Sequence, residues 1–296
     1  MMAKKVTPFS SLTEIALSEL AAGHCVSITG LSNSGKSNLM RSLADQNAKK
    51  FYPSKAGRSG FLIYIDCNRA VAISGQAFYE VVLRSTLERL SDEVPEALLT
   101  NLRGYHQTIT EADSSFTASL SFNLALSELC KELGQNLCLL FDEFDEIYTA
   151  LENRALLNLR ALRDRFRDRL VYATATRRSL PELRGETIED EFAELFSRST
   201  YNMPLLTIEE SLALLAGINL ASLKKEYKEK ASELAGGHPG MLVAVSQALA
   251  HLPKDWEGEP ADYVRLEPQP RAECMKLWHQ LSGEERAGLS SLVLEP

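Results

Sequence analysis

Gly30-Leu31-Ser32-Asn33-Ser34-Gly35-Lys36-Ser37 is the stretch that decides the fold of this chain. Its spacing matches G-x-x-x-x-G-K-[ST], the pattern of loops that wrap a polyphosphate with backbone N–H groups. The two glycines permit the backbone angles of such a loop, and the loop opens a helix whose N-terminal partial charge favours an anion. Lys36 is expected to reach the β- and γ-phosphates, and the Ser37 hydroxyl to ligate Mg²⁺.

The residues on either side supply the context that such a loop requires. Residues 25–29 predict a short buried strand before the loop, and residues 38–44 predict a helix after it. An ordinary Gly/Ser turn is the alternative interpretation. The predicted nucleotide contacts in this stretch are Gly30, Ser32, Asn33, Ser34, Gly35, Lys36, Ser37 and Asn38.

A second informative stretch is Leu137-Cys138-Leu139-Leu140-Phe141-Asp142-Glu143-Phe144-Asp145-Glu146. Its apolar part predicts a fully buried strand, and acidic residues follow at the end where open α/β sheets bind ligands. Asp142 is expected to hold Mg²⁺, directly or through water, and Glu143 to polarise the attacking water. The alternative for Glu143 is a surface acid at a strand end. Asp145 and Glu146 are predicted to be solvated at the start of the next helix.

Strands that alternate with helices predict an α/β fold with a five-stranded, parallel, doubly wound sheet. The predicted strands are residues 25–29, 61–68, 137–141, 170–175 and 201–205. The predicted helices around them are residues 11–22, 38–44, 78–90, 116–133, 154–169 and 189–196. Residues 91–115 are expected to be irregular, with a short helix near residues 96–102.

The strand pattern ends at residue 207, after which only helices are predicted. Helices over residues 209–216, 223–234 and 241–252 predict a helical lid, and the Pro- and acid-rich residues 253–270 predict a linker. A helix pair over residues 272–281 and 284–294 buries little by itself, so we expect the chain to be part of a longer protein. The predicted domains are residues 1–22, an N-terminal segment and helix; 23–206, the sheet core; 207–253, the lid; and 254–296, linker and helix pair.

Composition bounds the function classes. The chain has 296 residues, with 45% hydrophobic and 24% charged residues, which is ordinary globular composition. Its net charge of −8 disfavours non-specific binding to nucleic acid or to an anionic membrane, but it does not exclude a local basic patch. No apolar run approaches the length of a membrane span, and five scattered cysteines predict buried, reduced thiols in a cytoplasmic protein.

The two stretches together resemble the additional-strand, catalytic-glutamate class of P-loop ATPases. Three later features are similar to the AAA+-related STAND group, the signal-transduction ATPases with numerous domains. These features are the Thr-Ala-Thr-Arg run at residues 174–177, the segment Met203–Glu210, and Gly237-His238-Pro239. They resemble the group's sensor motif, its exit from the core and its Gly-x-Pro lid motif. The resemblance covers roughly residues 5–255.

The resemblance implies roles at the matching positions. Arg177 is expected to read the γ-phosphate, although the register between Arg177 and Arg178 stays open. Pro239 is expected to lie against the adenine, and it also suits the first position of a helix. Arg198 stands where AAA+ proteins carry a trans-acting arginine finger, which STAND members often lack. The C-terminal helix pair resembles the start of a winged-helix module, which follows the lid in this family.

The resemblance also implies a function: a Mg²⁺-dependent ATPase with slow turnover that acts as a molecular switch. ATP and ADP would set the arrangement of core and lid and thereby control homo-oligomerisation and an effector or sensor partner, often in immunity or defence signalling. Two alternatives stay open. One is a AAA+ remodeller or DNA-associated loader, and the other is a nucleotide-stabilised scaffold without turnover. The activating signal, the effector and the oligomer size are not specified by the sequence.

Overall fold

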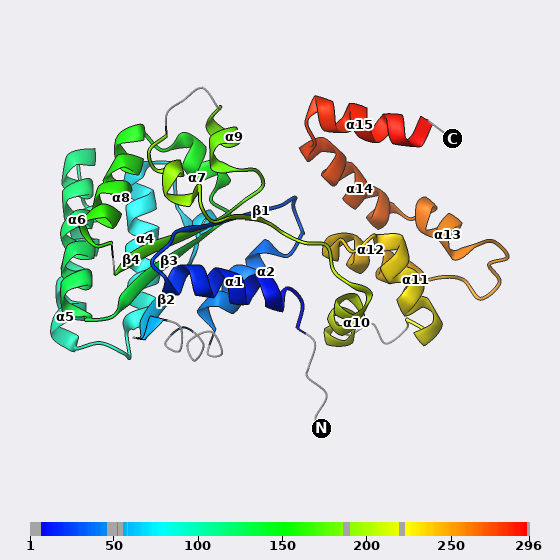
Figure 1. Ribbon diagram of the computed structural model, residues 1–296, viewed down its shortest axis with the longest axis horizontal. Helices are drawn as coiled ribbons and strands as arrows, with labels where there is room; N and C mark the ends of the chain where they lie inside the picture. The colour runs from blue at the N-terminus through cyan, green and yellow to red at the C-terminus, as the bar shows by residue number, and fades with distance from the viewer. Residues whose placement is uncertain are drawn as a thin grey trace. The chain divides into compact units, whose positions relative to one another are not determined.

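A computed structural model describes residues 7–45, 52, 56–57, 59–167, 169–185, 190–218 and 223–294 (Figure 1). Residues 1–6 of the predicted N-terminal segment and the predicted helix start at Glu189 lie outside these residues. Contacts divide the chain into two units. A sheet unit comprises residues 11–30 and 36–202, and a helical unit comprises residues 1–10, 31–35 and 203–296.

The sheet unit is built on five parallel strands in the order β2-β3-β4-β1-β5, which confirms the predicted α/β fold. The strand β5 is shorter than predicted. It ends before Pro204, because proline has no N–H to donate to the sheet ladder. The five strands are β1 (Val26–Thr29), β2 (Gly60–Asp66), β3 (Asn136–Asp142), β4 (Leu170–Thr176) and β5 (Thr200–Asn202).

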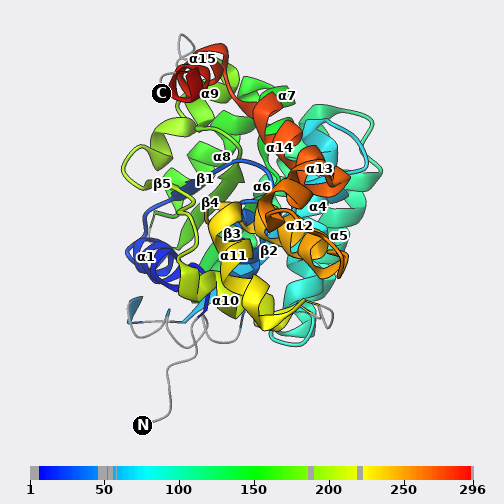
Figure 2. The same cartoon turned by 90° about the vertical axis from the view of Figure 1, so that its right-hand side faces the viewer.

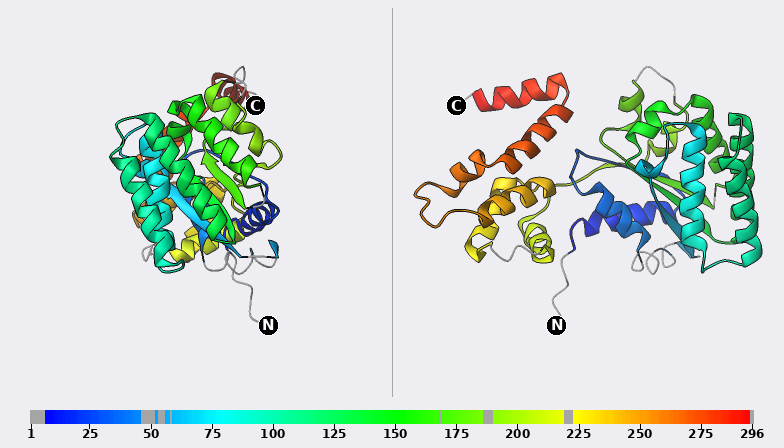
Figure 3. Two further views of the ribbon diagram at one scale, coloured as in Figure 1. Left: turned by 90° about the vertical axis from the view of Figure 1, so that its left-hand side faces the viewer. Right: turned by 180° about the vertical axis from the view of Figure 1, so that it is seen from behind.

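Helices cover both faces of this sheet. The helix α2 (Lys36–Ala44) contacts β2, β3 and β4, and α1 (Ser10–Ala21) lies beside it, on the side opposite α4, α5 and α6 (Figures 2 and 3). Right-handed crossovers explain this division, because the chain moves one way from β1 to β2 and the other way from β2 through β3 to β4. The helices after β2 are α4 (Gly75–Leu90), α5 (Glu96–Thr110) and α6 (Ser115–Glu132); those after β3 and β4 are α7 (Asp145–Ala150), α8 (Asn153–Arg165) and α9 (Leu180–Arg184).

An aromatic cluster fills the core on the face covered by α4. Phe78 of α4 lies 5.5 Å from Phe141 of β3 between ring centroids, and Phe141 stacks on Phe144 at 5.2 Å. Because side chains alternate along a strand, Phe141 faces this core while Asp142 faces the α2 side. The same burial that packs Phe141 therefore directs the acidic end of β3 to the opposite face.

In the sheet unit, one segment predicted to be irregular and one predicted helix differ from the structure. The segment expected to be irregular contains α5, a helix of 15 residues, because Leu98, Leu99, Leu102 and Ile109 are buried along it. The helix predicted over residues 189–196 is only a 3₁₀ turn, η2 (Ala193–Phe196). Composition alone did not predict α5, because most of its residues are polar and its buried apolar residues are few.

The helical unit contains α10 (Ile208–Gly217), α11 (Lys225–Ala235), α12 (Pro239–Ala250), α13 (Pro260–Leu266), α14 (Pro268–Gln280) and α15 (Gly283–Leu294). The segment predicted as a linker holds α13 and the start of α14. Pro260 and Pro268 stand at the first position of these helices, where a missing N–H costs no hydrogen bond. Prolines that the sequence analysis treated as linker residues therefore begin helices.

Four of the five cysteines are buried, as predicted, and Cys274 is exposed. Burial raises the pKa of the Cys130 and Cys138 thiols to about 12, so both stay protonated at neutral pH. In the part of the chain that the structure describes, no helix combines the length and the apolar character that a membrane span requires.

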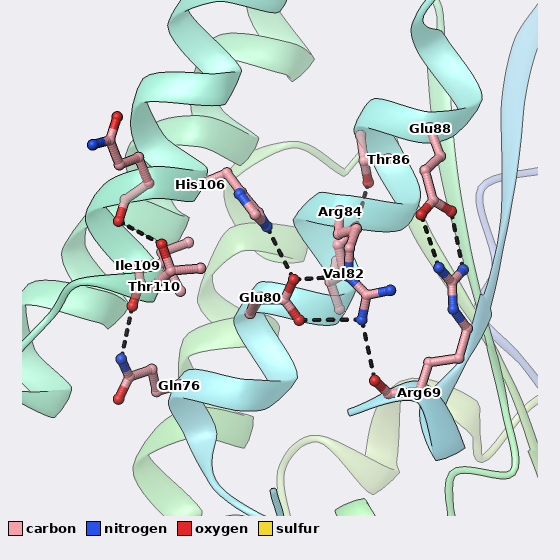
Figure 4. Close-up of polar contacts among 11 residues, drawn as sticks. Arg69, Gln76, Glu80, Val82, Arg84, Thr86, Glu88, His106, Ile109 and Thr110 are labelled. Atoms are coloured by element: carbon pink, nitrogen blue, oxygen red, sulfur yellow. Dashed lines mark hydrogen bonds and ion pairs between the residues drawn. The ribbon is translucent and has the colours of Figure 1, made fainter. Parts of the chain in front are cut away.

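A polar cluster ties α4 to α5 (Figure 4). The Glu80 carboxylate accepts hydrogen bonds from Arg84 Nε at 2.8 Å and pairs with His106 Nε2 at 3.0 Å. Burial raises the pKa of Glu80, but the hydrogen bonds from Arg84 and His106 outweigh it, so the pKa is lowered. About two turns further along the same helix, Glu88 pairs with Arg69, but the Glu88 side chain is 51% exposed against 13% for Glu80.

We therefore expect Glu80→Gln to lower the free energy of unfolding by about 1–2 kcal/mol at pH 7. Glu88→Gln removes the same charge from the same helix and should cost less than about 1 kcal/mol. A carboxylate with a lowered pKa stabilises the fold above its unfolded-state pKa of about 4.3, and loses that effect as the pH falls through the folded-state pKa. The Glu80→Gln difference should therefore shrink below about pH 4. Urea unfolding followed by circular dichroism measures both variants, and equal costs at pH 7 would contradict the assignment.

Candidate functional site

The carboxyl ends of β1, β3 and β4 meet at one edge of the sheet. The glycine-rich loop follows β1, and Gly30 N donates to Thr176 O, at the end of β4, at 3.1 Å. The turn after β3 is held by the same strand, since Phe144 N donates to Ala175 O at 3.2 Å. Two stretches that are about 110 residues apart in the chain are thereby brought to the same strand end.

Lys36 begins α2 and is enclosed. Lys36 is only 5% exposed, and its Nζ donates a hydrogen bond to Gly30 O at 2.7 Å. Burial lowers the pKa of Lys36, while the negative charges of Glu143, Asp145 and Asp142 oppose that shift. Ser37 follows in the first turn of α2 and is half-buried. The charges of three carboxylates therefore act on one ammonium group.

The tip of the loop, Leu31–Gly35, belongs to the helical unit. Asn33 and Gly35 both adopt left-handed backbone angles, with φ of 60° and 99°. Within this unit, Ser32 N donates to Gln280 Oε1 at 2.8 Å, and the Asn33 side-chain amide donates to Glu273 Oε1 at 2.9 Å. Ser34 is buried, and Asn38 is exposed on α2.

Asp142 ends β3 and is 1% exposed. Its Oδ1 accepts a hydrogen bond from Glu143 N at 3.0 Å, and its Oδ2 accepts one from the Tyr64 hydroxyl at 2.7 Å. Burial, reinforced by the hydrogen bond to Asp142, raises the pKa of Tyr64, so the hydroxyl stays protonated. The carboxylate is therefore held in one orientation at the sheet edge.

Glu143 has an unusual backbone, with φ of 50°. A residue with a Cβ rarely adopts this region, and such strain persists only where the surroundings impose it. The turn sends Phe144 back into the aromatic core while Glu143 stays exposed beside Asp142. Desolvation and the neighbouring Asp142 raise the pKa of the Glu143 carboxyl, while Lys36 opposes that rise.

The expected solvation of Asp145 is wrong. Asp145 is only 5% exposed, and its Oδ1 accepts hydrogen bonds from Arg177 N at 2.9 Å and from Arg177 Nε at 3.2 Å. Its position at the start of a helix predicts a solvated acid, and nothing in its spacing reveals a partner 32 residues further along. Glu146, which was given the same expectation, is exposed.

The two candidate sensor arginines have different partners. Arg177 is anchored to Asp145, the first residue of α7, which follows the Asp142–Glu143 pair after Phe144. Arg178 Nη1 lies 3.7 Å from Glu182 of α9. The geometry therefore favours Arg177 over Arg178 as the arginine of this sheet edge. Arg198 is exposed just before β5.

In the helical unit, Gly237-His238-Pro239 joins α11 to α12. Gly237 has a φ of 78°, and a Cβ there would lie 2.7 Å from Leu206 O. His238 Nδ1 accepts a hydrogen bond from Met241 N at 3.1 Å, so His238 acts as the N-cap of α12, and Pro239 occupies its first turn. Gly240 N donates to Asn33 O at 3.1 Å, so the residue after Pro239 contacts the tip of the glycine-rich loop.

No protein-family model matches the sequence, and the search of curated proteins also found no match. Solved structures do resemble the fold. The ORC2 protein of Aeropyrum pernix, solved in ADPNP–ADP complexes, matches with a TM-score of 0.57 at 15% identity, over 92% of this chain and 70% of that chain. The ORC1 protein of Aeropyrum pernix, solved in complex with DNA, matches with a TM-score of 0.56 at 14% identity, over 88% of this chain and 66% of that one.

A Walker-type ATPase of Pyrococcus abyssi matches with a TM-score of 0.50 at 20% identity, over 98% of this chain and 75% of that chain. At these identities the similarity concerns the fold. The parallel sheet and its surrounding helices match the fold of these solved structures.

We expect Gly237→Ala to destabilise the helical unit by about 1–3 kcal/mol, because the added Cβ meets backbone at a positive φ. Gly217→Ala, near the end of α10, is the control, since an added Cβ meets nothing within 4 Å there. Both tryptophans, Trp256 and Trp278, lie in this unit, so urea unfolding followed by tryptophan fluorescence reports on it selectively. Equal midpoints for the two variants would contradict the packing described for Gly237.

Proposed function

We propose that this chain binds ATP with Mg²⁺ and hydrolyses it, and that it works as a STAND-type nucleotide switch. The observation that carries the proposal is the gathering of Lys36, Asp142, Glu143 and Arg177 beside the glycine-rich loop, from three strand ends. The fold adds support, since it resembles the Aeropyrum pernix ORC2 protein, which was solved in ADPNP–ADP complexes.

The residues present fit a magnesium ion. Asp142 offers a carboxylate whose two hydrogen bonds leave further lone pairs on both oxygens, and Ser37 offers a hydroxyl. Mg²⁺ prefers such oxygen ligands and usually keeps several waters beside one or two protein groups and the substrate phosphates. When bound, the ion would neutralise charge on the β- and γ-phosphates.

The remaining catalytic work falls to the chain's own side chains. Loop N–H groups and Lys36 would bind the phosphates and offset the negative charge that the transition state spreads over the γ-phosphoryl oxygens. Glu143 would accept a proton from the water that attacks the γ-phosphorus. The bond between the γ-phosphorus and the β–γ bridging oxygen would break in the same step. The raised pKa of Glu143 brings this carboxylate closer to the basicity that a general base requires.

Arg177 would report the γ-phosphate to the rest of the chain. Its anchor is the buried Asp145, which directly follows the Asp142–Glu143 turn and Phe144. The lid would contribute Pro239 against the adenine, and ATP and ADP would then favour different lid positions and oligomeric states. An effector or sensor partner would read out that difference.

A second candidate is a DNA-associated loader ATPase. The specific observation in its favour is the similarity to the Aeropyrum pernix ORC1 protein, which was solved in complex with DNA. The net charge of −8 argues against a large phosphate-contacting surface. Salt-dependent binding of duplex DNA by the purified chain would favour the loader over the switch.

Glu143→Gln should bind ATP as wild type does but hydrolyse it at least about 10²-fold more slowly, the usual effect of a lost general base. Glu146→Gln removes the same charge from an exposed position three residues away and should retain the wild-type rate.

Lys36→Ala should lose tight ATP binding altogether. Calorimetry measures binding, and phosphate release measures turnover.

Two outcomes would contradict the proposal. Unchanged ATP affinity in Lys36→Ala would show that the phosphates bind elsewhere. Wild-type chain that binds ATP but releases no phosphate would favour a nucleotide-stabilised scaffold, and it would remove the catalytic role assigned to Glu143.

A further inference from the structure

The Asp142 carboxylate is fixed by two hydrogen bonds of different origin. Glu143 N binds Oδ1 at 3.0 Å and belongs to the adjoining residue, so it comes with the turn itself. The Tyr64 hydroxyl binds Oδ2 at 2.7 Å and comes from the neighbouring strand, 78 positions away in the chain. Tyr64 therefore supplies the hydrogen bond that the local backbone cannot supply.

The sheet register explains how Tyr64 reaches this carboxylate. Tyr64 pairs with Leu140 and Asp66 with Asp142 in the parallel ladder between β2 and β3, so Tyr64 and Asp142 are diagonal neighbours on one face. A diagonal pair lies too far apart for a short side chain but within reach of a tyrosine. Serine or threonine at position 64 would leave Oδ2 without this donor.

The tyrosine ring is held from its other side by α2. The Arg41 guanidinium lies over the Tyr64 ring at 5.2 Å from the centroid, within the range of a cation–π contact. Arg41 stands four residues after Ser37, which is one turn along the same helix. One ring thus contacts the helix that carries the expected hydroxyl ligand and the strand that carries the expected carboxylate ligand.

We propose that Tyr64 is a positioning residue that orients Asp142 for a divalent cation and thereby sets the affinity of the cation for the nucleotide-bound chain. The inference rests on the proposed function, because it deepens the role of Asp142. Groups that hydrogen-bond to a metal ligand typically change metal affinity by about 10–100-fold when they are removed. A hydroxyl that only fills a packing position would change stability without changing the cation's effect.

The test compares ATP affinity with Mg²⁺ and with EDTA, by calorimetry on the full chain freed of nucleotide. The ratio of the two affinities measures the coupling between cation and nucleotide. Tyr64→Phe keeps the ring under Arg41 and removes only the hydroxyl. We expect the ratio to fall about tenfold, the lower end of that range, while the affinity in EDTA stays at the wild-type value.

Tyr148→Phe is the matched control. The Tyr148 hydroxyl also donates to an aspartate, Asp190, whose side chain is 7% exposed and which is not a residue of the proposed site. Both variants should melt at a lower temperature than wild type, since each loses one part-buried hydrogen bond. Only Tyr64→Phe should change the Mg²⁺ ratio, and this difference separates positioning from packing.

Three results would overturn the inference: an unchanged ratio in Tyr64→Phe, an equal fall in the presence of Mg²⁺ and of EDTA, or the same fall in Tyr148→Phe. Its failure is distinguishable from a failure of the proposed function. If wild-type chain binds ATP more tightly with Mg²⁺ and Tyr64→Phe does the same, only the role of Tyr64 is wrong. If wild-type chain binds no ATP, the nucleotide site itself is wrong.

Discussion

Hydrogen bonding to the last residues of β4 is the constraint on which the candidate site depends. Gly30 N and Phe144 N donate to consecutive carbonyl groups, those of Thr176 and Ala175. One bond fixes the start of the glycine-rich loop, and the other fixes the turn that carries Asp142 and Glu143. β4 lies between β1 and β3, so it can hold both the loop after β1 and the turn after β3. Arg177 directly follows β4 and therefore lies at the same edge of the sheet.

Electrostatics follows from this arrangement. Lys36 is almost completely enclosed, and burial would disfavour its charge were it alone. The charges of Glu143, Asp145 and Asp142 oppose that effect only in part, because the pKa of Lys36 is still lowered. Each of the three acids has a different environment. Asp142 is held by Tyr64 and Asp145 by Arg177, whereas Glu143 stays exposed with a raised carboxyl pKa. The proposed function assigns three different roles to these three nearby acids: ligand, anchor and base.

The sequence predicted the elements that carry strong local patterns. The loop at residues 30–37 and the apolar run before Asp142 each specify a strand followed by a polar edge, and both lie where the patterns indicate. It did not predict partners that meet only through the sheet register. Tyr64 looked like any strand residue, and the buried Asp145 looked like a solvated helix start, because their partners lie 78 and 32 positions away.

Element boundaries also depended on packing that local composition does not encode. α5 is long because four apolar residues along it are buried, although most of its residues are polar. The prolines at 260 and 268 begin helices, and a reading by composition could not distinguish this role from a linker. The roles assigned to Pro239 and Arg177 came from resemblance, and they stay predictions.

The central claim is that three strand ends form one nucleotide site that uses a divalent cation. Titration of ATP into nucleotide-free chain by calorimetry, with Mg²⁺ and with EDTA, tests it most directly. The account predicts saturable binding of one ATP per chain that is tighter with Mg²⁺. Absence of saturable binding in both conditions would contradict it.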